Sequence, residues 1–270
     1  MTQIMEALET QKKRLEAHGY TVAYICLYGS QNYELDINNI DYQSDIDMKA
    51  IVVPTLDDLV RNSKPMSTVV ETEWGQCDIK DIRPYFQTLL KANPSYIETL
   101  FSKYYIVDEA FENEFITIFN KREILVDALK AQSIRAIYGM MCEKEKALCH
   151  PYPSIAHKIE KYGFDGKQLS HAHRLWLMMN YYYIENKPLA DCFTHNKINS
   201  EKLIDMKLNR HSLEYAKSSM EEIMVKAKTL RDEVLLKIDE KTTDYSIKDE
   251  FLALSQDIIK AKIMDECAWV

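Results

Sequence analysis

The sequence lacks the long apolar runs that a membrane-spanning segment requires. No stretch of its 270 residues approaches the ~20 apolar residues of a bilayer span, and its first residues are polar and acidic. With 46% hydrophobic residues, the chain has ample material for a folded core, which excludes a disordered protein. We therefore expect a soluble, cytoplasmic protein with no membrane partner.

Cysteine pairs and several catalytic signatures are also missing. The six cysteines are scattered with no C-x-x-C pair, which argues against structural zinc and against a disulfide framework. No G-x-S-x-G, P-loop or H-E-x-x-H motif is present, so hydrolase, Walker-type ATPase and zincin functions have no support. Glycine is scarce as well, with six residues, so a phosphate-binding loop would depend heavily on Gly29.

Acidic residues are concentrated in the first part of the chain. Residues 1–120 hold 10 Lys/Arg and 19 Asp/Glu, whereas residues 121–180 hold 10 and 6, within a total net charge of −8. A general nucleic-acid-binding protein is usually basic overall, because phosphate neutralisation supplies much of its affinity. The distribution instead suits an acidic metal centre combined with a basic region for a polyanion.

The first 108 residues alternate between helical and strand patterns. Residues 2–18 place apolar side chains on one helical stripe, and Thr21–Tyr28 is an apolar, β-branched run typical of a buried strand. Residues 45–53 predict a second strand, followed by a short helix in which Thr55 and Asp58 resemble a capping box. Residues 67–73 and 76–82 predict a hairpin around Trp74-Gly75.

After residue 109 the strand signal disappears. Apolar spacings of three and four predict helices over 109–148, 154–161, 165–185, 199–208, 212–238 and 246–263. We therefore expect an α+β protein with two domains. An α/β domain with a short mixed sheet spans residues 1–108, and an all-helical domain spans residues 109–270.

Two aspartates at the start of the second predicted strand form the centre of the candidate site. Asp45 and Asp47 are two residues apart, so on a strand both carboxylates lie on one face while Ile46 and Met48 face a core. Two adjacent carboxylates repel each other unless a proton or a divalent cation lies between them. Magnesium, which prefers oxygen ligands, is the expected ion.

A third carboxylate on a neighbouring strand would complete a two-metal site. Asp78 is flanked by apolar residues, as a buried strand position should be. Asp81 is the alternative, but it lies an odd number of residues from Asp78, hence on the opposite face, and its place before Pro84 suits a helix cap.

Gly29-Ser30 follows the first predicted strand. If a helix or tight turn opens after Ser30, its backbone N–H groups and the serine hydroxyl can hold nucleotide phosphates, and Gly29 allows close approach.

The order of these three motifs resembles that of the DNA polymerase beta-like nucleotidyltransferase superfamily, whose pattern is hG[GS], Dh[DE]h and hDh with h apolar. The corresponding stretches are Leu27-Tyr28-Gly29-Ser30, Asp45-Ile46-Asp47-Met48 and Cys77-Asp78-Ile79. Within the superfamily, the chain is most similar to the predicted nucleotidyltransferases of bacterial RNA repair called RlaP. Residues 89–101 resemble that family's "NP..lE.Lf" segment, and residues 162–175 resemble its "yD.K.a.H..RL" helix.

The resemblance implies transfer of a nucleoside monophosphate from an NTP such as ATP to a hydroxyl group. Asp45, Asp47 and Asp78 would be the catalytic carboxylates holding two Mg²⁺ ions, or Mn²⁺, and Gly29 with Ser30 would anchor phosphates. The helical domain would cover the nucleotide. An RNA end is the expected acceptor and would dock on residues 121–180. A protein acceptor, as in antitoxin-type adenylyltransferases, and a non-catalytic nucleotide-binding module are the alternatives.

The helix at residues 165–185 supplies the basic candidates. The resemblance implies that Lys167 and His173 face the nucleotide, with Arg174 beside them. Helical spacing alone places Lys167, Ser170 or His171, and Arg174 along one ridge, with His173 about 100° away from Arg174. The chain departs from the family in a longer segment between Ser30 and Ser44, and in Gln31, where arginine is expected.

Overall fold

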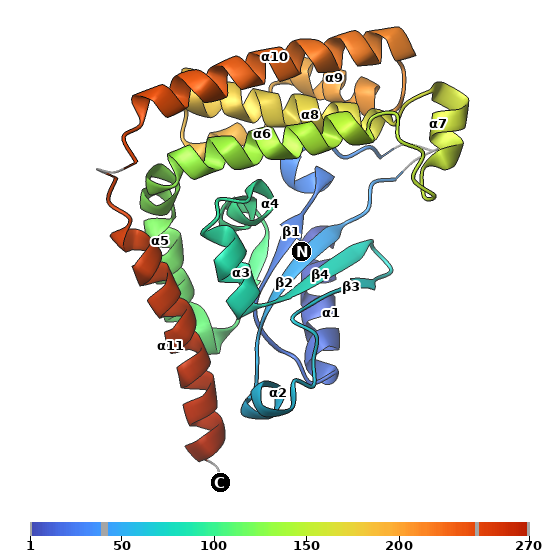
Figure 1. Cartoon of the computed structure of the whole chain (residues 1–270). Helices are drawn as coiled ribbons and strands as arrows, with labels where there is room; N and C mark the ends of the chain where they lie inside the picture. The colour runs from blue at the N-terminus through green and yellow to red at the C-terminus, as the bar shows by residue number, and fades with distance from the viewer. Residues whose placement is uncertain (1, 39–42, 241–242, 269–270) are drawn as a thin grey trace. The chain divides into compact units, whose positions relative to one another are not determined.

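A computed structural model describes residues 2–38, 43–240 and 243–268, and it confirms the expected α+β class. Within these residues the strands belong to the N-terminal half, and the rest is mostly helical (Figure 1). The segment between Ser30 and Ser44, which the sequence marks as unusually long, lies partly outside the described residues, at 39–42.

The described strands form one mixed sheet of five in the order β3-β4-β2-β1-β5. Strands β1 and β2 pair antiparallel, β2 and β4 pair parallel, and β3 and β4 form the predicted hairpin. The short edge strand β5 was not predicted from the sequence. The strand bounds are β1 Thr21–Tyr28, β2 Asp47–Val53, β3 Ser67–Glu71, β4 Gln76–Asp81 and β5 Tyr105–Val107.

One face of the sheet packs on helix α1 (Gln3–Ala17). Alternate strand residues, among them Leu27, Met48 and Ile79, meet Leu8 and Leu15 of this helix in a continuous apolar core. The predicted strand over residues 45–53 is confirmed, although β2 begins at Asp47 and Asp45 lies just before it. Ile46 and Met48 are buried, as their parity predicted.

The opposite face of the sheet is covered by helices that come from distant parts of the chain. Tyr24 of β1 stacks on Phe115, and Phe86 contacts Phe251 of the last helix. The helices and 3₁₀ turns of this region are α3 Ile82–Leu89, α4 Pro94–Ile97, η2 Glu98–Phe101, η3 Glu109–Phe111, α5 Glu112–Ala128 and α11 Ser246–Ala268.

The chain divides into two compact units. Unit 1 comprises residues 1–129 and 244–270, and unit 2 comprises residues 130–243. The boundary expected at 108/109 thus falls inside unit 1, because α5 and α11 pack with each other and α11 also packs on α3. No helix among the described residues is both long enough and apolar enough to span a bilayer.

Unit 2 is built from helices that pack around α8 (Gly166–Met179). Helices α6, α9 and α10 each contact it, and its chain continues into a π-helical turn, η4 (Asn180–Ile184). The other elements of unit 2 are α6 Lys130–Ala147, α7 Ala156–Tyr162, η5 Leu189–Cys192, α9 Lys197–Lys207 and α10 Leu213–Lys237.

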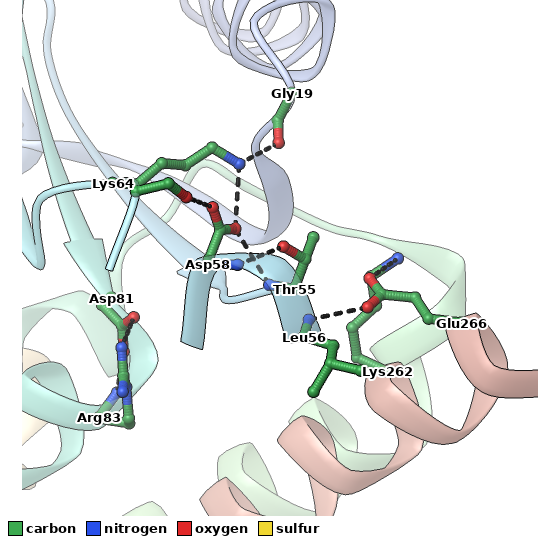
Figure 2. Close-up of polar contacts among 10 residues, drawn as sticks. Gly19, Thr55, Leu56, Asp58, Lys64, Asp81, Arg83, Lys262 and Glu266 are labelled. Carbon is green, nitrogen blue, oxygen red and sulfur yellow. Dashed lines mark hydrogen bonds and ion pairs between the residues drawn. The ribbon is translucent and has the colours of Figure 1, made fainter. Parts of the chain in front are cut away.

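A polar network anchors helix α2 (Leu56–Arg61) in unit 1, as Figure 2 shows. The predicted capping box is confirmed: Thr55 and Asp58 exchange backbone-to-side-chain hydrogen bonds of 3.1 and 3.0 Å. Asp58 also accepts hydrogen bonds from Ser63 and Lys64. The Leu56 N–H donates to Glu266 of α11 at 2.8 Å, which ties α11 to α2.

We predict that Asp58→Asn lowers the free energy of unfolding by about 2 kcal/mol at pH 7, because hydrogen bonds to a charged acceptor are lost. Burial alone would raise the pKa of Asp58, but hydrogen bonds from Ser63, Thr55 and Lys64 outweigh it and hold the pKa well below its ordinary value. This stabilisation is complete above the unfolded pKa of about 3.9 and is lost as pH falls through the lower folded pKa. Urea unfolding at several pH values measures the difference.

Asp57→Asn is the matched control. Its carboxylate is mostly exposed and pairs with Arg61 one helical turn away, so its removal should change stability by less than about 0.5 kcal/mol. Equal effects of the two substitutions at pH 7 would contradict this role for Asp58.

Candidate functional site

The register of β1 and β2 brings the first two motifs together. Tyr28, the last residue of β1, pairs with Asp47, the first residue of β2, so Gly29 leaves the sheet beside the Asp47 side chain. A Cβ atom at Gly29 would lie only 2.8 Å from the Asp47 carboxylate Oδ2. There is therefore no room for a side chain between Gly29 and this carboxylate.

The predicted turn after Gly29 is present as a 3₁₀ helix, η1 (Ser30–Tyr33). The side chains of Gln31, Asn32 and Tyr33 hold this turn in place. Asn32 accepts a hydrogen bond from Ser102, and Tyr33 donates one to the buried Glu98. Gln31 donates to the carbonyl oxygens of Ser44 and Asp45, both at 3.1 Å. Gln31 thus joins the turn to the aspartate segment.

A second glycine lies behind Asp45. A Cβ at Gly75 would meet the Asp45 Cβ at 2.8 Å and the Ile46 carbonyl oxygen at 2.9 Å. The neighbouring Gln76 N–H donates to Asp47 Oδ1 at 3.3 Å. The β3–β4 turn therefore supports both aspartates from the side opposite η1, a role that the sequence analysis did not assign to Gly75.

A polar hollow of about 430 Å³ opens beside Asp45, which is exposed. Its volume lies within the range of small-molecule sites. Neither Asp47 nor Asp78 contributes to its wall, which is formed by Gln3, Gln31, Asn38, Gln43, Ser44, Asp45, Ile46, Glu73 and Trp74.

The third carboxylate lies in a different setting. Asp78 pairs with Lys49 across the parallel β2–β4 ladder, on the same face as Asp47. Its Oδ2 lies 3.2 Å from the Lys49 Nζ, and its Oδ1 lies 3.0 Å from the Lys80 Nζ. Among the described residues, no three His, Cys, Asp or Glu side chains come together as a metal-binding group.

Asp81 acts as the cap that its position suggested. It is buried at the N-terminus of α3, where it accepts a hydrogen bond from the Arg83 N–H at 2.8 Å and forms a bidentate ion pair with the Arg83 guanidinium. These bonds occupy the Asp81 carboxylate.

The surroundings of Asp45, Asp47 and Asp78 indicate which of these carboxylates fit a hard cation. Asp45 and Asp47 offer two carboxylates at one end of β2, and a magnesium ion held by one or two carboxylates completes its shell with water and substrate phosphates. The Asp78 oxygens instead face two ammonium groups. Asp45 and Asp47 thus carry oxygens of the kind such an ion takes, whereas the Asp78 oxygens are already paired with Lys49 and Lys80 and do not fit the predicted role of a third ligand.

The basic candidates of α8 belong to unit 2 and point in different directions. Lys167 is exposed, and Arg174 is buried. His173 Nε2 contacts the Ser219 hydroxyl of α10 at 2.9 Å, and burial lowers the pKa of His173 to about 4, so the ring is neutral at pH 7. His173 thus bonds to α10 within unit 2, and the nucleotide contact expected for it stays a prediction.

His171, two residues before His173, lies among positively charged side chains instead. Burial first, and then the charges of Arg174, Lys167, Lys144 and Lys207, lower its pKa well below the ordinary value. These charges come from α8, α6 and α9, so they form a basic cluster around one ridge of α8. In the helix pattern quoted above, the histidine precedes the arginine by three residues. Counted back from Arg174, this position is His171, so the sequence pattern could have indicated His171 instead of His173.

Comparisons with known proteins give no match: none of the protein-family models fits the chain, and neither the curated proteins nor the solved structures contain a significant match. The family resemblance of the motifs stays a prediction.

We predict that Gly29→Ala lowers the free energy of unfolding by about 1–3 kcal/mol, because its φ of 80° and ψ of −154° belong to a region that only glycine adopts readily. The contact with Asp47 Oδ2 adds to the strain. Thermal and urea unfolding provide the measurement. Gly139→Ala is the control, since this helical glycine has open space around it and alanine there should add about 0.5–1 kcal/mol. Unchanged stability of Gly29→Ala would disprove the packing described for this turn.

Proposed function

We propose that this chain is a metal-dependent nucleotidyltransferase that moves a nucleoside monophosphate from an NTP to a hydroxyl acceptor, an RNA end. The observation that supports the proposal most directly is the close approach of Gly29 to the Asp47 carboxylate, which leaves no room for a Cβ at residue 29. The turn that we propose to bind phosphate and the pair that we propose to bind the cation are thus neighbours at the end of one strand pair. Transfer of a nucleotidyl group requires this combination, because the triphosphate must be held beside the cation that neutralises it.

In the proposed reaction, the acceptor hydroxyl oxygen forms a bond to the α-phosphorus of the NTP. The bond from that phosphorus to the bridging oxygen of the β-phosphate breaks, and pyrophosphate leaves with both bonding electrons. The hydroxyl proton passes to water. A divalent cation supplies charge neutralisation on the phosphate oxygens, and Asp45 with Asp47 would hold it.

The protein's own groups account for the rest of the binding. The first N–H groups of a turn such as η1 lack partners within the turn and suit phosphate oxygens, and the Ser30 hydroxyl lies at its start. The hollow beside Asp45 has room for the nucleoside, with Trp74 as an aromatic wall. Gln31 keeps the turn and the Asp45 backbone together in this proposal, a structural use for the residue that replaces the expected arginine.

The basic cluster of unit 2 supports a polyanionic acceptor. The pKa of His171 is lowered by burial and by the charges of Arg174, Lys167, Lys144 and Lys207. The pKa of Lys144 is itself lowered, by burial and by the charges of Lys167 and Arg174. Positive charges held close together gain stability when a phosphate group binds among them. The roles of Lys167 and Arg174 in binding the NTP itself rest on the motif resemblance alone.

We predict that Asp45→Asn and Asp47→Asn each reduce nucleotide incorporation by a factor of at least about 10²–10³, because the charge that holds the cation is lost. The assay follows label from each of the four α-labelled NTPs into purified RNA and into protein, with Mg²⁺ or Mn²⁺. Asp57→Asn, an exposed acid of the same unit, should retain full activity.

Each outcome of this assay identifies a class. Label in RNA supports the proposed acceptor, and label in protein indicates an antitoxin-type adenylyltransferase instead. No incorporation, together with NTP binding in calorimetry, indicates a non-catalytic module, which the ion pairs of Asp78 favour as the second candidate. Full activity of either aspartate variant would remove the proposed site.

We predict that Lys144→Glu and Lys167→Glu weaken RNA binding at every sequence. Each should reduce the slope of log K against log salt by about one for every RNA phosphate that the variant no longer neutralises. Fluorescence anisotropy at several salt concentrations measures both quantities. The control is Lys197→Glu, an exposed lysine at the far end of α9 from Lys207. An unchanged salt slope in the two cluster variants would exclude this surface as the RNA site.

A further inference from the structure

The most unusual charged residue of unit 1 is Lys49, which lies in the middle of β2 and is 2% exposed. Its ammonium group lies 4.5 Å from the Tyr28 ring centre and 4.3 Å from the Tyr96 ring centre. Aromatic faces attract cations, and the attraction grows when water is excluded. The two rings therefore fix the ammonium group in one place.

This ammonium group neutralises the third carboxylate of the site. It lies 3.2 Å from Asp78 Oδ2, while Lys80 approaches the other oxygen of Asp78 to 3.0 Å and also bonds the Ser67 hydroxyl. A divalent ion at Asp78 would have to displace two cations, one of which is enclosed. Its attraction to one carboxylate would be opposed by two positive charges at close range.

Lys49 also belongs to the same strand face as Asp47. The two residues are two apart on β2, so both side chains leave the sheet on the side covered by α4. The chain itself therefore supplies positive charge beside Asp78. Lys49, which carries this charge, is only two residues from Asp47 on the same strand.

We propose that the site takes up a single divalent cation, at Asp45 and Asp47, and that the Lys49 ammonium group stands beside Asp78 in place of a second ion. This inference rests on the proposed function. Lys49 is then a positioning residue that holds Asp78 in a fixed orientation without an added ion. This single-ion site differs from the two-ion arrangement that the motif resemblance implies.

Equilibrium dialysis with Mn²⁺ tests the stoichiometry on the full chain. The nucleotide probe is an equimolar mixture of the four NTP analogues with a methylene group between the α- and β-phosphates. We predict one retained Mn²⁺ per wild-type chain, and an Mn²⁺ affinity at least about tenfold lower in Asp47→Asn. Two retained ions in the wild type would overturn the single-ion proposal while leaving the nucleotidyltransferase proposal in place.

Substitutions at the ion pair show which groups bind the cation. The double variant Lys49→Met, Asp78→Asn removes both charges together, which avoids leaving one buried charge unpaired, and should still retain one Mn²⁺. The variant Lys49→Met, Lys80→Met frees Asp78 and should retain a second ion that disappears when Asp78→Asn is added. Circular dichroism establishes that each variant is folded, and the wild-type count decides the question if a variant is not.

Two other outcomes are informative. Loss of the Mn²⁺ in the folded Lys49→Met, Asp78→Asn variant would make Asp78 a ligand and would overturn the inference alone. No Mn²⁺ retained by the wild type, with or without the nucleotide mixture, would overturn both the inference and the proposed function.

Discussion

The antiparallel pairing of β1 with β2 is the contact on which the other features depend. Its register sets Tyr28 opposite Asp47, and so decides that the turn at Gly29 begins beside a carboxylate. The same register decides the burial of every residue of β2. A slip by one residue would turn Asp47 and Lys49 into the apolar face against α1 and would bring Met48 out of it. Such a slip is costly on both faces, which pins the strands in place.

The two faces of the sheet have different chemistry. The face against α1 presents apolar strand residues to the core, where Gln11 of α1 is a buried polar side chain. The other face combines large aromatic side chains with buried ionisable groups, including Lys49 and Glu98. Charges removed from water need partners with good geometry, and here the partners are Asp78, Tyr96 and Tyr33. One face therefore gives stability, and the other holds a fixed electrostatic arrangement.

Local patterns were enough to predict β1 to β4, the hairpin and the cap at Asp81, because alternation and capping act over a few residues. They were not enough for Lys49, whose isolated charge in an apolar strand finds its partners only through tertiary contacts with Asp78 and Tyr96. Helical spacing likewise placed His171 and His173 on different sides of α8 without saying which side packs on α10. The expected boundary at 108/109 falls inside unit 1 for the same reason, since the apolar spacing of a helix does not reveal which unit it joins.

The composition of unit 1 from two separate stretches of chain has a consequence for the protein's synthesis. Phe251 and Ile258 of α11 are fully buried against residues translated long before them, and the whole of unit 2 is made in between. During translation, the whole of unit 2 would therefore emerge from the ribosome before α11, one of the helices that cover the sheet of unit 1. Nascent chains of unit 1 would carry exposed aromatic surface until α11 emerges, and this interval is when they would most need a chaperone.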